Sequence, residues 1–394
     1  MNILSLIGRE EALITDLAGN EYFISGEISN SRFLVLGGAG SIGQAVVKEI
    51  FKREPKALHV VDLSENNLVE LVRDIRSSFG YIEGEFKTYA LDIGSREFEV
   101  YFKDQEPFHY VLNLSALKHV RSEKDPYTLM RMVDVNIVNT IKTIELSINS
   151  DVKKYFCVST DKAANPANMM GASKRIMEMY LHKYSQNISI STARFANVAF
   201  SDGSLLHGFH QRLLKDQPIA APNDIRRYFV TPQEAGELCI MSTILGNTGD
   251  IFFPKLNEDL YMIPFSDIAI RFLKYKGFEP VECSSEKEAR ERVSELKEKN
   301  QWPCFFSHSD TSGEKEYEEF FVEDEDVDLS RFESLGVVKN SATASEDKLD
   351  LFLTSIAKAK ESGKWSREDL LQLFRELLPS FIHSERGKSL DEKM

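Results

Sequence analysis

The sequence predicts an α/β protein: a Rossmann-type, doubly wound and mostly parallel sheet, followed by a smaller irregular region and a helical C-terminal tail. Two observations lead to this prediction. Apolar runs of strand length alternate with helix-like segments from Arg32 to about Arg194, and a cluster of glycines directly follows the first run. Alternation of this kind is typical of parallel sheets whose connecting helices cover both faces.

The glycine cluster is the most informative part of the chain. It follows an apolar run at 33–36 and precedes a helix-like segment at 44–51, and it comprises Gly37, Gly40, Ser41, Ile42 and Gly43. Glycines allow a sharp turn and a close approach to a pyrophosphate, whose charge the N–H groups at a helix start can bind. A second apolar run ends in Asp62, which could accept hydrogen bonds from a ribose. This order predicts a dinucleotide-binding site, with a glycine-rich turn in another α/β domain as the alternative.

The other elements follow in chain order. Strands are expected at 33–36, 58–61, 85–91, 110–114, 154–158 and 188–194, and helices at 44–51, 67–78, 126–147 and 171–184. We expect a lead-in over residues 1–30, a Rossmann domain over 31–200, a mainly substrate-binding region over 201–336 and a helical extension over 337–394. The acidic run at 322–328 is expected to form a surface loop, and 284–299 a polar helix.

The C-terminal extension should contain two helices, at about 348–361 and 367–378. Ser366 and Asp369 have the spacing of a capping box at the start of the second helix. Leucines and a phenylalanine line one face of that helix, so we expect it to dock on the chain's own core rather than on another subunit. The last dozen residues are polar and are expected to be disordered.

Composition limits the class of protein. The chain has 394 residues, 42% of them hydrophobic, and a net charge of −14, which argues against a nucleic-acid partner. None of the cysteine pairs has metal-ligand spacing, so no metal site is predicted. We also expect no membrane span and no signal peptide, and therefore a cytoplasmic protein.

Polar and small residues follow the later strands, where ligands bind in a parallel sheet. Asp92 and Ile93 follow the third strand, and the acid could receive an adenine amino group or only cap a turn. Ala116 lies in a run of small residues against which a cofactor could lie. Lys118 and His119 come next and could face a substrate, although such a pair is often only solvated surface.

The fifth strand leads into Thr160, Asp161 and Lys162. A neutral carboxylic acid could protonate a leaving hydroxyl, and a neutral amine could remove a carbon-bound proton. Both roles require shifted pKa values, which a partly desolvated cleft can supply. An ordinary Asp–Lys surface turn is the alternative.

Met170 and Lys174 open the following helix at the spacing that tyrosine and lysine have in short-chain dehydrogenases. A thioether cannot act as a general base, so the first proton must go to Thr160 or to a water held by Lys174. Beyond the sixth strand, arginine and asparagine side chains suit a diphosphate, because a guanidinium fork matches phosphate oxygens. The candidates there are Arg194, Asn197, Ser204 and Arg227.

Six of these segments together resemble the nucleotide-sugar 4,6-dehydratases of bacterial polysaccharide biosynthesis, which are extended short-chain dehydrogenase/reductases. The segments lie at 36–43, 115–120, 159–163, 168–175, 194–198 and 227–231. The most similar group acts on UDP-N-acetylglucosamine, and a further segment at 312–315 adds Glu314 as a substrate residue. The chain departs from the family at Leu36, at Ala196 and in the tail after residue 337.

The resemblance implies a mechanism. NAD takes a hydride from sugar carbon 4, Lys162 removes the proton on carbon 5, Asp161 protonates the departing hydroxyl of carbon 6, and the hydride returns to carbon 6. Lys174 would hold the nicotinamide ribose, and Met170 would form a wall of the substrate pocket. No arginine follows Asp62, so NAD is expected rather than NADP. A nucleotide-sugar substrate and a homo-oligomer are also expected.

Two other functions remain open from the sequence. A sugar-nucleotide 4-epimerase would share the fold and the cofactor, but it would normally have tyrosine at Met170. A non-catalytic nucleotide-binding scaffold would have no reason to keep Asp161 beside Lys162. The sequence leaves open the identity of the nucleotide base, the configuration at carbon 5 and the final glycan.

Overall fold

A large twisted sheet forms the centre of the molecule. The computed structural model describes residues 2–256, 262–309 and 319–383. Within them the main sheet has nine strands. In spatial order these are β15 (Val327–Asp328), β16 (Leu335–Lys339), β11 (Asp250–Pro254), β6 (Ser189–Phe195), β5 (Lys154–Thr160), β4 (Tyr110–Asn113), β1 (Arg32–Leu36), β2 (Ala57–Asp62) and β3 (Glu85–Ala90). The predicted doubly wound α/β fold is therefore confirmed.

All six predicted strands belong to this sheet, and the seven strands from β3 to β11 run parallel. β16 and β15 add an antiparallel edge. The central strands are buried on both faces; Phe33, Leu34, Val35 and Leu36 of β1, for example, have no exposed surface. Continuous apolar runs fit such strands, because helices cover both faces of the sheet.

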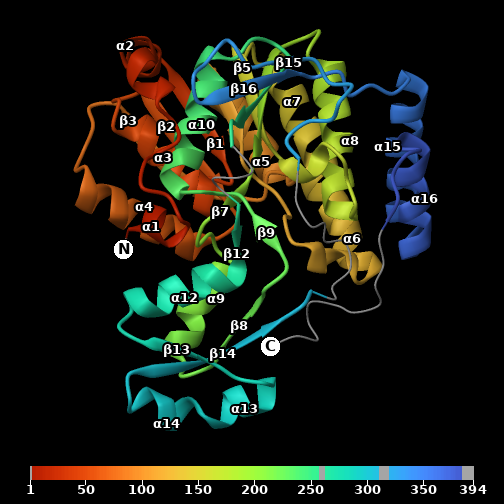
Figure 1. Cartoon of the computed structure of the whole chain (residues 1–394). Coiled ribbons are helices and arrows are strands. Elements are labelled where there is room, and N and C mark those ends of the chain that lie inside the picture. The colour runs from red at the N-terminus through yellow and green to blue at the C-terminus, as the bar shows by residue number, and fades with distance from the viewer. Residues whose placement is uncertain (1, 257–261, 310–318, 384–394) are drawn as a thin grey trace.

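Helices cover the two faces in separate layers (Figure 1). One layer contains α3 (Ser41–Phe51), α4 (Glu65–Ser78) and α10 (Pro232–Leu245), and the other contains α5 (Arg96–Asp104), α7 (Asn139–Asn149) and α8 (Met169–Tyr184). The helix expected at 126–147 consists of α6 (Pro126–Val133), a π-helical segment (Asp134–Val138) and α7. α5 was not predicted; it is short, and only Phe98 and Phe102 are buried.

The N-terminal lead-in is folded and largely helical. It holds α1 (Ile3–Leu6) and the longer helix α2 (Asp16–Ser29), whose Ile24 and Ile28 are fully buried in the main core. Arg9 between these helices forms a buried ion pair with Glu234 of α10. The lead-in therefore belongs to the folded body.

The main sheet also extends past residue 200, because β11 and β16 come from the later part of the chain. The rest of that part forms a lower lobe (Figure 1). The lobe contains a parallel sheet of β13 (Glu279–Glu282), β14 (Gln301–Ser307) and β8 (Ile219–Pro222), with helices α9 (Leu205–Leu214), α12 (Phe265–Tyr275), α13 (Glu286–Glu291) and α14 (Val293–Lys297). The single polar helix predicted at 284–299 is thus two short helices.

The C-terminal helices α15 (Glu346–Ser362) and α16 (Arg367–Leu377) pack on α6 and α8 through one apolar cluster. The predicted capping box is present, since Ser366 accepts from the Asp369 N–H and the Asp369 carboxylate accepts from the Ser366 N–H. Docking on the chain's own core is confirmed. Residues 384–394, where disorder was expected, lie outside the described residues.

None of the helices in the described parts of the chain has both the length and the apolar character needed to cross a bilayer.

Candidate active site

The predicted site residues meet at one edge of the main sheet. The strands β3, β2, β1, β4 and β5 are neighbours in this order and run parallel, so the segments that follow them leave from the same edge. Asp62 and Thr160 are the last residues of their strands, and Gly37, Asp92 and Ala116 lie in the segments that follow the other three. The spatial order of the strands thus brings together residues that are spread over more than a hundred positions of the sequence.

The glycine turn between β1 and α3 is held very close to the neighbouring segment. Gly37 has φ of +71°, and a Cβ atom there would lie 2.7 Å from the backbone nitrogen of Ser115. A Cβ atom on Gly43 would lie 2.2 Å from the Gly37 carbonyl oxygen. Gly40 is the N-cap of α3 and supplies no side-chain cap, which leaves N–H groups of Ser41 and Ile42 for an anion. The turn therefore fits a pyrophosphate.

Asp62 and Asp92, the two acids near the glycine turn, accept hydrogen bonds from different backbone segments. The Asp62 carboxylate accepts from the N–H groups of Ala39 (3.0 Å) and Ser64 (2.9 Å), and it thereby fixes the glycine turn. Each oxygen retains a lone pair that a ribose hydroxyl could use. Asp92 accepts from the Gly94 N–H at 2.8 Å and so caps a turn, while the Ile93 side chain is buried in the core.

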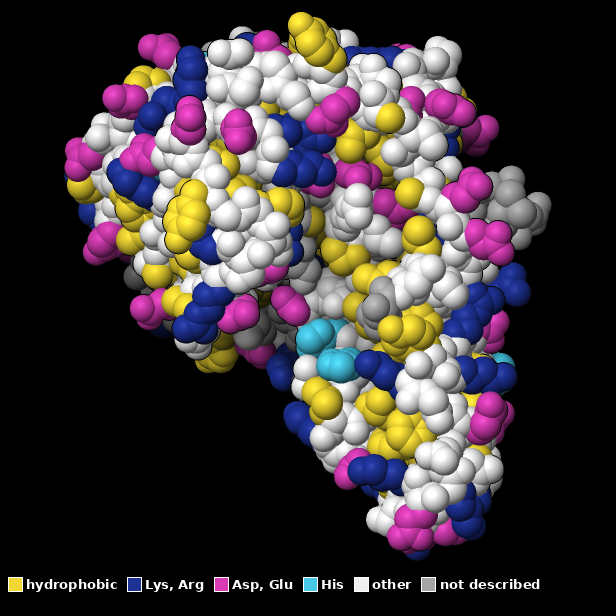
Figure 2. Space-filling view, turned by 90° about the vertical axis from the view of Figure 1, so that its left-hand side faces the viewer, with side chains coloured by type: hydrophobic (Ala, Val, Ile, Leu, Met, Phe, Trp, Pro, Cys, Tyr) yellow, Lys and Arg dark blue, Asp and Glu magenta, His cyan; other side chains and the backbone are white. Residues whose placement is uncertain are grey.

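Lys118 and His119 lie where the sheet domain meets the lower lobe. Lys118 Nζ donates to Ser201 Oγ at 3.4 Å, and the His119 ring faces Gly203 of the same loop. Partial desolvation lowers the pKa of both side chains, and the charge of Lys118 lowers that of His119 further. The molecular surface is hollowed where the two lobes meet, with histidine and basic side chains beside the hollow (Figure 2).

Thr160, Asp161 and Lys162 form a compact unit, which we call the catalytic turn after the role that the sequence predicts for it. It starts at the last residue of β5 and continues into a single turn of 3₁₀ helix. The buried Asp161 carboxylate accepts at Oδ1 from Thr160 Oγ1 (2.8 Å), from the Lys162 backbone N–H (2.8 Å) and from Lys162 Nζ (2.9 Å). A hydroxyl, a carboxyl and an amine are therefore in direct contact, as an acid–base pair requires.

Helix α8 passes directly beside the catalytic turn. Lys174 is buried, its Nζ donates to the Val158 carbonyl oxygen of β5 at 3.0 Å, and burial lowers its pKa. Met170, one turn earlier, is 5% exposed and belongs to the apolar cluster that α6, α8, α15 and α16 share. The close approach depends on Gly171, because a Cβ atom there would lie 2.5 Å from the Lys162 carbonyl oxygen.

The predicted substrate residues beyond β6 lie in three settings. The Asn197 Nδ2 atom is buried and has no hydrogen-bond partner within the described residues, so it is available to a ligand oxygen. Ser204 caps α9 by accepting from the His207 N–H at 3.2 Å. Arg227 is buried on the short strand β9 (Arg226–Arg227). Glu314 lies outside the described residues.

One expectation is wrong, and a second holds only in part. Arg194 does not face a diphosphate: it has no exposed surface and forms ion pairs with Glu178 and Glu325. The acidic run at 322–328 is not simply a surface loop, since Glu325 is buried against that arginine. Sequence patterns predict a solvated position for a charged residue whenever its partner lies in a distant segment, because such a partner cannot be recognised from the sequence.

The structure adds residues that sequence reasoning did not identify. Arg212 of α9 has a buried Nη1 atom without a hydrogen-bond partner within the described residues, and burial followed by the charge of Arg121 lowers its pKa. The two arginines are close enough for the charge of Arg121 to act on Arg212, and together they favour an anionic ligand. Arg212 gave no signal in the sequence, whereas Gly171 lies inside a recognised motif and was not singled out.

Comparisons with known proteins agree with this arrangement. The model of a family described as polysaccharide biosynthesis protein matches residues 33–340. The probable polysaccharide biosynthesis protein EpsC of Bacillus subtilis is 30% identical over 288 residues, which cover 71% of this chain and 47% of EpsC. An uncharacterized membrane protein, MJ1061, of Methanocaldococcus jannaschii is 29% identical over 80% of this chain and 87% of its own. The chain thus spans about half the length of EpsC and nearly all of MJ1061.

A solved structure, Pen from Bacillus thuringiensis, has the same fold with a TM-score of 0.64. It is 22% identical, and the match covers 83% of this chain and 98% of Pen. UDP-glucose 4-epimerases of Rickettsia species also match in sequence, at 25% to 27% identity over 56% to 61% of the chain and 65% to 73% of theirs.

Proposed function

This chain belongs to the polysaccharide biosynthesis protein family, and we propose that it is an NAD-dependent 4,6-dehydratase of a nucleotide-activated N-acetylhexosamine, with UDP-N-acetylglucosamine as substrate. It is an enzyme of the sugar-nucleotide dehydratase and epimerase group. The observation that carries the finer proposal is the contact between Asp161 and Lys162 in the catalytic turn. Removal of water from a sugar needs an acid and a base that act at neighbouring carbons, and this pair supplies both.

The contact between Asp161 and Lys162 also explains how the two side chains reach the protonation states that the reaction needs. The reaction needs Asp161 protonated and Lys162 neutral, and moving one proton over the 2.9 Å between Nζ and Oδ1 produces this state from the ion pair. A bound substrate that excludes water from this pair would favour its neutral form over the ion pair. No additional proton has to enter or leave the site.

The proposed steps then balance. NAD, when bound, would accept the hydride of sugar carbon 4 and later return it to carbon 6. In between, Lys162 takes the proton from carbon 5, which the new ketone at carbon 4 acidifies, and Asp161 gives its proton to the hydroxyl of carbon 6, which leaves as water. This elimination restores the ion pair, and Lys162 then returns its proton to carbon 5 when the hydride arrives at carbon 6. The hydroxyl proton of carbon 4, which is released with the hydride, would pass to Thr160 or to a water held by Lys174 and return from there to Lys162, so that the pair ends the cycle as it began.

Other residues of the chain would bind the two ligands. The glycine turn with the uncapped start of α3 would hold the pyrophosphate of NAD, and Asp62 its adenosine ribose. Lys174 would reach the nicotinamide ribose. The unpartnered amide of Asn197, together with Arg212 and Arg227, would bind the diphosphate of the substrate.

The test is incubation of the purified protein with UDP-N-acetylglucosamine, followed by mass spectrometry and NMR of the product. Loss of one water together with a ketone at carbon 4 is the expected result. An unchanged mass with inverted configuration at carbon 4 would instead support a 4-epimerase, the activity named for the Rickettsia relatives. Absence of any product with UDP-, dTDP- and GDP-sugars would overturn both and leave a nucleotide-binding scaffold.

A further inference from the structure

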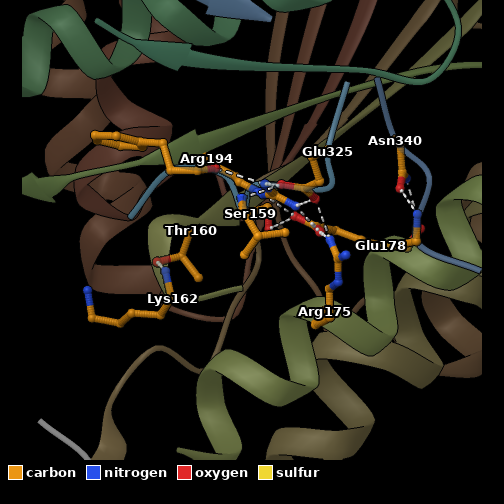
Figure 3. Close-up of polar contacts among 11 residues, drawn as sticks. Ser159, Thr160, Lys162, Arg175, Glu178, Arg194, Glu325 and Asn340 are labelled. Carbon is orange, nitrogen blue, oxygen red and sulfur yellow. Dashed lines mark hydrogen bonds and ion pairs between the residues drawn. The ribbon is translucent and has the colours of Figure 1, made fainter. Parts of the chain in front are cut away.

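A largely buried network of four charges lies beside the catalytic turn (Figure 3). Arg194 of β6 is fully buried, and its guanidinium contacts Glu178 of α8 and Glu325, each with N–O distances of 2.8 Å. Arg175 of α8 bridges the same two carboxylates at 3.1 and 2.8 Å. Two positive and two negative charges make the network neutral, as burial demands. We call these four residues the charge network.

One hydrogen bond connects this network with the catalytic turn. Ser159 and Arg194 are register partners in the adjacent strands β5 and β6, so their side chains point to the same face of the sheet. Ser159 Oγ donates to Glu178 Oε1 at 2.7 Å. Because Ser159 directly precedes Thr160, this bond fixes the end of the strand from which the catalytic turn starts.

The network also holds the helix that carries Lys174. Glu178 lies one helical turn after Lys174, and Arg175 directly follows Lys174. Asn340 Nδ2 donates to the Glu178 carbonyl oxygen at 2.9 Å and adds a contact from the segment after β16. Strand β5 and helix α8 therefore meet at the Glu178 carboxylate, which Arg194 and Arg175 connect to Glu325.

The charges of the network are fixed rather than variable. Although burial alone would raise the pKa of both acids, the Arg194 guanidinium holds the pKa of Glu178 below its usual range and that of Glu325 at about 2. Both carboxylates therefore stay ionised and keep accepting hydrogen bonds in one geometry. Such a network is suited to holding neighbouring groups in place and not to exchanging protons with them.

We propose that Ser159 and Glu178 are positioning residues for the catalytic turn, and that Arg194 and Glu325 lock Glu178 in the required orientation. This inference rests on the proposed dehydratase function. The hydroxyl of Ser159 is not needed to neutralise the network, because the ion pairs of Arg194 and Arg175 remain when the hydroxyl is removed. Its contribution is to hold the strand end, and hence Asp161 and Lys162, in register with the substrate.

The experiment compares two serine variants in the full-length protein. Glu178→Gln is the obvious variant, but it would leave Arg194 short of a carboxylate and could prevent folding. Ser159→Ala removes only one buried hydrogen bond. Ser191→Ala is the matched control, since Ser191 lies buried on β6 and donates to the Ser242 carbonyl oxygen at the same distance of 2.7 Å.

We expect both variants to lose the same small amount of thermal stability. Only Ser159→Ala should lose about tenfold or more in kcat, because a displaced reacting group slows the chemical step. Its KM and its content of bound NAD should stay close to the wild-type values, and its pH profile should shift because the Asp161–Lys162 pair is no longer held in register.

Equal kcat values for the two variants, with an active wild-type enzyme, would overturn the positioning role and leave the proposed function intact. A kcat that falls only in parallel with the melting temperature would show a merely structural role and would also overturn the inference. If the wild-type protein releases no water from any nucleotide sugar, the proposed function itself is overturned, and the positioning role with it.

Discussion

Replacement of Gly171 by alanine tests whether the approach of α8 to the catalytic turn controls the reaction. The added Cβ atom would lie 2.5 Å from the Lys162 carbonyl oxygen and 3.2 Å from both the carbonyl carbon and the Cβ atom of Lys162. The nearest atom belongs to the backbone, so a rotamer change cannot relieve the contact. Either α8 or the catalytic turn must move.

The size of the effect follows from this geometry. Ordinary contacts begin at 3.4 Å, so the two segments must separate by about 0.9 Å. Overpacking of this kind costs about 1–3 kcal/mol of stability. A displacement of about 1 Å in reacting groups can cost about 100-fold in rate. We therefore expect Gly171→Ala to fold with a melting temperature lowered by a few degrees and to lose about 100-fold in kcat.

The assay is the initial rate of product formation measured by mass spectrometry, together with a thermal melt. Gly26→Ala is the control, because Gly26 is also helical, in α2, and a Cβ atom there would meet nothing within 4 Å. This control should keep its full rate and gain about 0.5–1 kcal/mol of stability. A wild-type rate in Gly171→Ala would refute the argument that the packing of α8 fixes the catalytic turn.

Three further predictions follow from the site, the charge network and the C-terminal helices. Lys162→Met should abolish release of water while NAD stays bound, and measurable turnover would exclude Lys162 as the base. The depressed pKa of Glu325 should stabilise the fold by roughly 3 kcal/mol above about pH 4.5, and this contribution should be lost as the pH falls toward 2. In urea titrations Glu325→Gln should therefore lose less stability than the wild-type protein over this pH range. Parallel pH curves for the two proteins would contradict this prediction. Removal of residues 341–394 should expose the apolar faces of α6 and α8, so that the shortened protein forms larger species than the intact chain in size-exclusion chromatography; an unchanged association state would contradict this expectation.

Much of the candidate site could be predicted because its signals are local. A glycine turn after an apolar strand, an acid at the end of the next strand and the run from Thr160 to Lys162 each lie within a few consecutive residues. Their convergence also followed, since parallel strands place their carboxyl ends at one edge. The role of Arg194 could not be predicted in this way, because one of its partners, Glu325, is 131 residues away.

The sequence by itself determined the alternation of strands and helices, the glycine turn, the capped C-terminal helices and the types of chemical group available at the sheet edge. Each of these depends on a few neighbouring residues, where backbone geometry and apolar periodicity are decisive. Only the tertiary structure decided that β11 and β16 extend the sheet, that α2 completes the core, and that Gly171 and the charge network border the catalytic turn. These features depend on contacts between distant segments, and a residue's burial and partners are set by whatever the folded chain packs against it.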